Sequence, residues 1–269
     1  MTNKPRHILG LSGGKDSTAL ALYLRDKVPE MEYVFCDTGK ELPETYEYLA
    51  RVEAFLGKKL IVLNDRAGFD HWLKVFDGFL PAPNMRWCTK LLKLKPFEAF
   101  VGDDPVISYI GLRADEDRTG LISGKPNLKT VFPFKEDGID YEKVMGILED
   151  SGIGLPPYWS WGRTNSGCSF CFFQKPYEWV RLLETHPDLY DDAQKYEKIS
   201  DEPGKTFTWN QDMPLAELRK PENIEAIKFR FFERQAQAKK KRKNKRLVEI
   251  LSDYECDDGE PKPCLICQL

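Results

Sequence analysis

Residues 8–17 read Ile-Leu-Gly-Leu-Ser-Gly-Gly-Lys-Asp-Ser, and the helix-forming run Thr-Ala-Leu-Ala-Leu-Tyr-Leu follows at 18–24. This order predicts a strand, a tight glycine turn and a helix. Backbone N–H groups at a helix N-terminus carry roughly half a positive charge, which suits a phosphate group. The two glycines let the backbone approach an anion closely, because neither has a Cβ atom. The stretch therefore predicts a phosphate-binding turn at the end of the first strand.

The side chains of this turn add charge and donors to the backbone. Lys15 supplies a full positive charge, and Ser12 and Ser17 supply hydroxyl groups. The spacing differs from the Walker pattern, in which four residues separate the first glycine from a Gly-Lys pair. We therefore expect a phosphate site of a different kind from that of the P-loop NTPases.

Two more blocks follow strand-like runs. Residues 37–45 read Asp-Thr-Gly-Lys-Glu-Leu-Pro-Glu-Thr, and residues 111–116 read Gly-Leu-Arg-Ala-Asp-Glu. Together with SGGKDS at 12–17, these blocks resemble the PP-loop, the DTGxExPET segment and the GxRAxES segment of the ATP pyrophosphatase superfamily. The resemblance is to the branch that includes the phosphoadenylylsulfate (PAPS) reductases. Asp117 stands where that pattern usually has serine.

The resemblance implies a fold, an activity and a set of site residues. The fold is α/β, a doubly wound and mostly parallel sheet of the adenine nucleotide alpha hydrolase type. The activity is cleavage of ATP between the α and β phosphates, with transfer of AMP to an acceptor oxygen and release of pyrophosphate. Lys15, Asp16 and Arg113 are the implied catalytic residues, with Asp16 near Mg²⁺. The implied ATP-binding residues are Ser12, Gly13, Gly14, Lys15, Asp16, Ser17, Asp37 and Gly39.

The intact loop separates this chain from the assimilatory reductases, which lack the lysine of SGGKDS and use a C-terminal Glu-Cys-Gly-type segment. The chain more closely resembles the ATP pyrophosphatase of DNA phosphorothioation systems, the DndC or SspD type, which belong to bacterial defence. That resemblance implies sulfur modification of DNA, with a cysteine desulfurase as sulfur donor and other modification proteins as partners. Transfer RNA thiolation, reduction of an adenylylated sulfate, and a nucleotide-sensing iron–sulfur module without turnover are the alternatives.

Alternating strand-like and helical patterns independently predict parallel strands with crossover helices. The pattern changes at 154–175, where proline, tryptophan, glycine and cysteine crowd into an expected loop. From Pro176 onward it is helical, with a long helix expected over 222–251. We therefore expect a PP-loop nucleotide-binding domain at 1–153 and, at 154–269, a cysteine-containing loop with a helical C-terminal region packed on the first domain.

The chain has seven cysteines. Cys168 and Cys171 form a CxxC pair, a spacing that lets two thiolates reach one metal centre. Cys88 precedes a predicted helix, a position that lowers a thiol pKa. In the PAPS-reductase-like branch, cysteines at these places bind a [4Fe–4S] cluster, which makes Cys88, Cys168 and Cys171 the implied ligands. Cys36 is expected in the core.

The fourth ligand is open: Cys256, Cys264 or Cys267 closes the cluster, or one iron keeps a free site. A structural zinc site fits the same spacing, and unligated thiols are a third interpretation. Aromatic residues surround the CxxC, and we expect them to shield a cluster, with base stacking as the alternative. They are Trp159, Trp161, Phe170, Phe172 and Phe173. His71 and His186 receive no role.

Composition is that of an ordinary globular protein, with 269 residues, a formal charge of −3 and 41% hydrophobic residues. No apolar run approaches the ~20 residues of a membrane span, and the N-terminus lacks the apolar core of a signal peptide. We therefore expect a cytoplasmic protein with reduced thiols and no membrane partner. Residues 239–246 are dense in lysine and arginine. They are either a solvated helix end or a contact for a nucleic-acid backbone.

Overall fold

The computed structural model describes residues 4–117, 125–165, 167–200, 206–210 and 213–244. Its centre is a five-stranded sheet in the order β3-β2-β1-β4-β5, in which every neighbouring pair is parallel. The strands are Arg6–Gly10 (β1), Glu32–Asp37 (β2), Ile61–Asn64 (β3), Val106–Tyr109 (β4) and Leu128–Val131 (β5). The predicted α/β class with a doubly wound parallel sheet is confirmed.

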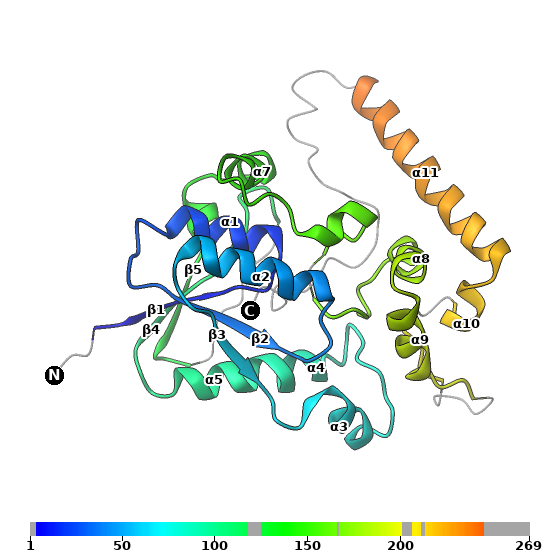
Figure 1. Cartoon of the computed structure of the whole chain (residues 1–269), viewed down its shortest axis with the longest axis horizontal. Coiled ribbons are helices and arrows are strands. Elements are labelled where there is room, and N and C mark those ends of the chain that lie inside the picture. Colours follow the sequence, from blue (N-terminus) through cyan, green and yellow to red (C-terminus); the bar gives the residue numbers. More distant parts are fainter. Residues whose placement is uncertain (1–3, 118–124, 166, 201–205, 211–212, 245–269) are drawn as a thin grey trace.

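Helices cover both faces of this sheet. Figure 1 shows α1, α2 and α7 over one face and α5 over the other. The helices run Lys15–Leu24 (α1), Pro43–Leu56 (α2), Gly68–Val75 (α3), Trp87–Thr89 (α4), Lys95–Val101 (α5), Pro133–Glu136 (α6), Tyr141–Asp150 (α7), Pro176–Thr185 (α8), Pro187–Lys195 (α9), Leu215–Leu218 (α10) and Pro221–Asn244 (α11). A π-helix spans Lys90–Leu94 (η1), and a 3-10 helix spans Pro157–Trp161 (η2).

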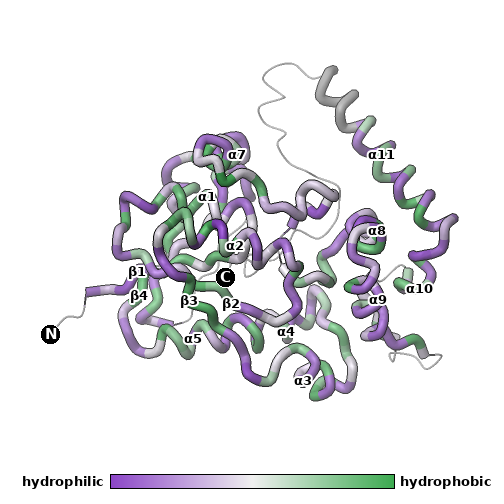
Figure 2. The backbone as a smooth tube through the Cα atoms, in the orientation of Figure 1, coloured by the Kyte–Doolittle hydropathy of each residue, from purple (hydrophilic) through white to green (hydrophobic). Residues whose placement is uncertain are grey.

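Strand β1 supplies core residues to both faces, because successive side chains of a strand point to opposite sides. Leu9 packs with residues of α1, α2 and α7, whereas Ile8 packs with Phe97 and Val101 of α5. Leu9 and Ile8 are both fully buried. Figure 2 shows the corresponding apolar strands at the centre of the molecule. Cys36 lies in the α5-side cluster, which confirms its predicted place in the core.

The strand order fixes where the motifs meet. β2 and β3 lie on one side of β1, and β4 and β5 lie on the other, so the direction of winding reverses between β1 and β4. Ligands of such sheets bind outside the carboxyl ends of the strands at this reversal. SGGKDS follows β1, residues 37–45 follow β2, and residues 111–116 follow β4. All three motif blocks therefore lie at one edge of the sheet.

The C-terminal helices α8–α11 lie to one side of the sheet (Figure 1). A second apolar cluster fills this region, with Trp179 and Tyr190 from the helices and Leu42, Phe69 and Trp87 from the first part of the chain. The cluster crosses the predicted boundary between 153 and 154, which stays a prediction. The expected helix over 222–251 is seen as α11 to Asn244, and its last residues lie outside the described ranges. Among the described residues, no helix combines the length and apolarity needed to span a membrane.

Candidate functional site

Gly13 in the turn after β1 has a backbone conformation that favours glycine. Gly13 has φ +75°, and a Cβ atom placed on it would lie 2.7 Å from Cγ2 of Thr45. The Tyr158 hydroxyl donates to the Gly13 carbonyl at 2.9 Å, which ties η2 to the turn. Gly14 is the N-cap of α1, and no side-chain hydrogen bond caps that end among the described residues. The N-terminal N–H groups of α1 are therefore available to an anion.

The hydroxyls and charges of the turn form one connected group. Ser12 Oγ lies 3.2 Å from Ser17 Oγ, and Ser17 Oγ donates to the Gly14 carbonyl. The Asp16 carboxylate pairs with Lys15 Nζ at 2.6 Å and with Arg113 Nη1 at 3.1 Å. The predicted residues Ser12, Lys15, Asp16, Ser17 and Arg113 therefore come together at the end of β1.

Arg113 links the third motif block to the turn. Its guanidinium also pairs with Asp115 at 3.0 Å and with Glu116 at 3.1 Å. Burial alone would lower the pKa of Arg113, but the carboxylates around it, Asp16 foremost, raise the pKa above its ordinary value. A Cβ atom on Gly111 would lie 2.9 Å from the Asp16 carbonyl, so the two loops are in close contact.

The second motif block folds onto itself beside the turn. Asp37 Oδ1 accepts hydrogen bonds from the Gly39 N–H and the Tyr46 hydroxyl, both at 2.8 Å. Gly39 has φ +71°, and beyond its two chain neighbours no atom of the described residues would lie within 4 Å of a Cβ placed there. Asp37 therefore stabilises the loop, while Gly39 faces open space at the carboxyl end of β2.

This same loop pairs with the loop that carries the CxxC motif. Glu41 and Cys168 form an antiparallel β-bridge, and the Ser169 N–H donates to the Lys40 carbonyl at 2.6 Å. The Thr38 hydroxyl donates to Glu41 Oε1 at 2.8 Å and lies 3.2 Å from Cys168 Sγ. Burial raises the pKa of the Glu41 carboxyl, against the charge of Lys93. The loop at 37–45 and the loop that carries the CxxC motif, the cysteine loop, are thus joined by backbone and side chains.

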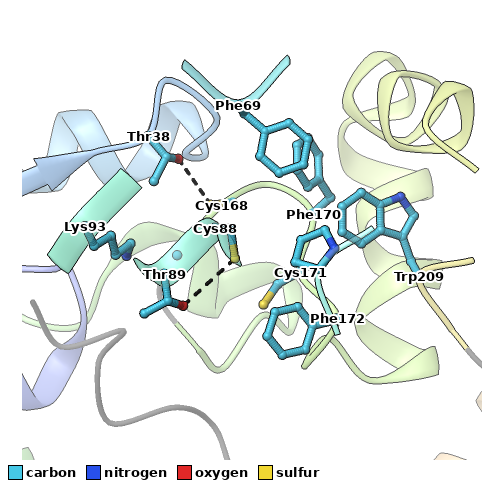
Figure 3. A pocket seen from close by; sticks show the side chains of 12 residues that line it. Thr38, Phe69, Cys88, Thr89, Lys93, Cys168, Phe170, Cys171, Phe172 and Trp209 are labelled. Carbon is cyan, nitrogen blue, oxygen red and sulfur yellow. Dashed lines mark hydrogen bonds between the residues drawn. The ribbon is translucent and has the colours of Figure 1, made fainter. Parts of the chain in front are cut away.

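Cys88, Cys168 and Cys171 line one cavity of about 40 Å³ (Figure 3). The remaining lining residues are mostly apolar or aromatic: Thr38, Phe69, Pro81, Thr89, Lys93, Gly167, Phe170, Phe172 and Trp209. Burial raises the thiol pKa values of Cys88 and Cys168 to about 12 and that of Cys171 to about 11. The three predicted cysteines therefore converge on one cavity. Cys88 comes from α4, and Cys168 and Cys171 come from the cysteine loop.

The expectation that a helix N-terminus lowers the Cys88 pKa is wrong. The α4 helix is only three residues long, and burial in the apolar cavity dominates instead. The expected shielding by five aromatics is also only partly correct. Phe170 and Phe172 line the cavity, whereas the Trp161 indole donates to Glu44 and the Trp159 ring lies 6.0 Å from Lys15 Nζ.

The donor set of the cavity fits a metal that prefers sulfur. Three thiols among apolar walls suit an iron–sulfur cluster or zinc, which bind thiolates in such surroundings. Among the described residues, no group of three or more His, Cys, Asp or Glu side chains is already arranged to hold a metal ion. The predicted fourth ligands Cys256, Cys264 and Cys267 lie outside the described residues. Cluster and zinc therefore stay predictions.

Arg163 holds the cysteine loop in shape. Its side chain is buried, with 2% of the residue exposed. It donates to the carbonyls of Cys168 at 2.7 Å and Ser169 at 3.3 Å, and to Gln174 Oε1 at 2.7 Å. A fourth bond reaches the Asn165 carbonyl at 3.1 Å. Sequence reasoning missed this residue, because nothing in its local pattern marks a buried cation.

His186 also has a partner that the sequence did not reveal. Its Nε2 lies 2.7 Å from Oε1 of Glu44, a residue of the second motif block, and the Trp161 indole donates to the same oxygen. His71 contacts the Trp72 ring and joins no such group among the described residues. The basic run at 239–246 begins on α11, but its side chains lie outside the described ones.

The chain is similar to known proteins over the region that carries the three motif blocks. Residues 6–122 match the phosphoadenosine phosphosulfate reductase domain, which agrees with the resemblance seen in the sequence. An uncharacterized protein of Methanocaldococcus jannaschii is 37% identical over 113 residues, 40% of this chain and 23% of that protein. The tRNA-specific 2-thiouridylase MnmA of Pseudomonas fluorescens is 30% identical over 189 residues, 56% of this chain and 49% of the enzyme. The chain thus spans less than half of either relative.

Among solved structures, the U34-tRNA thiolase NcsA of Methanococcus maripaludis, with its [4Fe-4S] cluster, is similar at 14% identity and a TM-score of 0.39. The match covers 81% of this chain and 80% of the thiolase.

Proposed function

We propose that this chain is an ATP pyrophosphatase that transfers AMP to an oxygen atom of a nucleic acid and so prepares that oxygen for replacement by sulfur. The observation that carries the proposal is the bridge between Glu41 and Cys168. This bridge sets the loop at 37–45 against the cysteine loop. Adjacent sites suit this chemistry, because an adenylated oxygen has to meet sulfur before water hydrolyses it.

The turn supplies the phosphate site of this reaction. The N–H groups at the start of α1 and the hydroxyls of Ser12 and Ser17 would bind the phosphate oxygens. Lys15 and Arg113, now paired with Asp16, would exchange this carboxylate for phosphate oxygens. Asp16 would then be released to hold Mg²⁺, whose usual ligands are carboxylates and phosphate oxygens.

The same cations act on the transition state. The acceptor oxygen attacks the α phosphorus, the bond to the β-phosphate oxygen breaks, and pyrophosphate leaves with the electron pair. Lys15 and Arg113 stabilise the charge that develops on the leaving group. The surroundings of Trp159 also favour a nucleotide site at the turn. Its indole Nε1 is buried without a partner among the described residues, and its ring is near Lys15.

The cysteine cavity is the proposed sulfur site. Cys88, Cys168 and Cys171 would hold a [4Fe–4S] cluster or zinc through thiolates, after their protons are released. A bound cluster supplies iron that carries sulfur, whereas zinc supplies only a structural tie. The apolar walls keep water away, and Arg163 fixes the carbonyls of the loop. The proposed sulfur donor is a cysteine desulfurase. The proposed location of the reaction is the cytoplasm.

The comparisons favour transfer RNA as the acceptor, because the relative MnmA is described as a tRNA-specific 2-thiouridylase. Sulfur would then attack the base carbon that bears the adenylated oxygen, forming the carbon–sulfur bond as the carbon–oxygen bond breaks and AMP leaves with that oxygen. A DNA phosphate is the second candidate. The intact loop at 12–17 together with the cysteines at 88, 168 and 171 resembles the DNA phosphorothioation proteins, and this resemblance supports the second candidate.

The test is an anaerobic assay for pyrophosphate and AMP with Mg²⁺ and ATP, alone, with transfer RNA, and with duplex DNA. We expect Lys15→Ala to lower the rate about 10²- to 10³-fold, the range for loss of one transition-state donor. Lys27→Ala, at an exposed lysine beyond α1, is the matched control. Stimulation by one polymer identifies the acceptor. Pyrophosphate release at the wild-type rate in Lys15→Ala would refute the assignment of the turn.

A further inference from the structure

Two adjacent phenylalanines beside the cysteine cavity belong to none of the three apolar clusters of the described residues. Phe172 and Phe173 are half-buried, and their ring centroids lie 4.3 Å apart. Phe172 lines the cavity next to Cys171 (Figure 3). Phe170 of the same loop behaves differently, because it is 3% exposed and packs against Trp209. The core therefore explains Phe170 but not the pair that follows it.

A cation lies over the second ring of this pair. The Arg86 guanidinium is 5.1 Å from the centroid of Phe173. The Lys90 N–H donates to the Arg86 carbonyl at 3.1 Å, so the two residues are one helical turn apart. Arg86 is the N-cap residue of α4, and Lys90 is the first residue after this helix. Both are exposed, whereas Cys88 between them lines the cavity.

We propose that Arg86, Lys90, Phe172 and Phe173 form a docking platform for an unpaired base of the acceptor nucleic acid. The proposal rests on the function proposed above and names how its substrate is held. A single-stranded base offers a free face that stacks on aromatic rings and on guanidinium planes. The phosphates on either side of that base meet the two cations. Because Phe172 also lines the cavity, a base on this platform lies beside Cys171.

The combination of groups selects this ligand over other anions. An acidic peptide would satisfy the two cations but would leave the phenylalanine faces without a planar partner. A base-paired duplex would satisfy the cations as well, but its bases have their faces stacked on one another. The platform therefore predicts a preference for single strands that depends on both charge and stacking.

The test measures binding of a fluorescent RNA strand of about 12 nucleotides, the span of one to three sites of this kind, by anisotropy at several salt concentrations. The same RNA annealed into a duplex and unlabelled polyglutamate are the comparison ligands. The variants are Phe173→Ala and the pair Arg86→Ala with Lys90→Ala. The matched control pair is Lys27→Ala with Lys59→Ala, two exposed lysines in the loops that lead into β2 and β3. Circular dichroism checks that each variant is folded.

We expect Phe173→Ala to weaken single-strand binding about 5- to 100-fold, the effect of losing one stacked base. The double variant should reduce the salt slope by about 1.4, because each phosphate contact on a single strand contributes about 0.7. The control pair should leave both values unchanged. Pyrophosphate release without polymer, measured in parallel, reports on the proposed ATP chemistry separately.

Three results would overturn the platform. The first is no binding of the single strand by the wild-type protein. The second is equal binding of strand and duplex, or competition by polyglutamate as strong as that by unlabelled strand. The third is equal weakening by the platform pair and the control pair. Absence of pyrophosphate release by the wild-type protein, both with and without polymer, would instead refute the ATP chemistry and leave the binding result standing.

Discussion

Arg113 and Asp16 lie 97 positions apart in the sequence, and their side chains pair at 3.1 Å across the end of the sheet. This pair connects the loop after β4 to the turn after β1. It also neutralises the arginine while no phosphate is bound. The expected role of Arg113 therefore depends on the geometry of its planar fork as well as on its charge.

Arg113→Lys keeps the positive charge but loses the fork that reaches Asp16, Asp115 and Glu116. We expect pyrophosphate release to fall about 100-fold, since one preorganised donor to the leaving group is lost. The steady-state rate with saturating ATP is the measurement. Arg25→Lys, at an exposed arginine beyond the end of α1, is the control and should keep the wild-type rate. A wild-type rate in Arg113→Lys would remove Arg113 from the catalytic group.

Gly13→Ala places a methyl group 2.7 Å from Cγ2 of Thr45 at a positive φ. We expect the free energy of unfolding to fall by about 2 kcal/mol, and ATP binding to weaken with the displaced turn. Gly146→Ala is the matched control, because Gly146 lies within α7 and, among the described residues, no atom beyond its chain neighbours and the backbone of its own helix is within 4 Å of an added Cβ. That change should stabilise the protein by about 0.5–1 kcal/mol. Urea unfolding measures both.

Adding Thr45→Ser to Gly13→Ala separates the two causes. Serine lacks the Cγ2 atom of threonine, so the contact is relieved while the backbone strain remains. We expect part of the lost stability to return. If none returns, the close contact with Thr45 is not what requires glycine at this position.

Arg163→Lys removes most of the hydrogen bonds that hold the cysteine loop. The cost should be about 3 kcal/mol, because several buried carbonyl groups lose their donor. The specific readout is native-state alkylation of single cysteines, followed by mass spectrometry. Cys168 and Cys171 should label faster, while Cys36, buried in the sheet, should not change. Equal acceleration at Cys36 would mean that the whole fold, not the loop, is loosened.

The contact between Glu44 and His186 leads us to predict that the stability of the protein depends on pH. Burial raises the pKa of Glu44, but hydrogen bonds from its own backbone, His186 and Trp161 outweigh burial, and the net pKa is lowered. A carboxyl with a lowered pKa stabilises the fold above its unfolded pKa of about 4.3, and this contribution is lost as pH falls through the folded pKa. Stability should therefore decline in acid below about pH 4 partly through Glu44.

Glu44→Gln tests this effect. At pH 7 the variant should be less stable by about 1 kcal/mol or less, because the pair is partly exposed. The difference should shrink as pH falls below about 4, where Glu44 of the wild-type protein becomes protonated. Glu47→Gln, at an exposed glutamate of the same helix, is the control. A difference that is constant from pH 7 to pH 3 would exclude ionisation of Glu44 as the cause.

Much of the fold was predictable, because its signals are local. The apolar run before SGGKDS and the start of α2 at Pro43 depend on short stretches of sequence. The edge strand β5 has no comparable local signal, since Leu128–Val131 is short and only partly buried. The meeting of the three motif blocks was predictable from strand ends, and the ion pairs of Asp16 are consistent with it.

The contacts that join distant segments were not predictable. Glu41 and Cys168 are 127 positions apart, and no periodicity links them. The partner of His186 lies 142 positions away. The error at Cys88 has a physical reason: position before a helix is visible in a sequence, whereas burial in a cavity is not. Sequence therefore predicted which groups take part, but not the surroundings that set their chemistry.

The backbone pairing of residues 40 and 41 with 168 and 169 has a thermodynamic consequence. A ligand that orders one of these loops orders part of the other, so occupancy of the two sites is coupled. Coupling of this kind is reciprocal: the factor by which a metal in the cavity tightens ATP binding equals the factor by which ATP tightens metal binding. Removal of a metal bound by Cys88, Cys168 and Cys171 should therefore raise the dissociation constant for ATP.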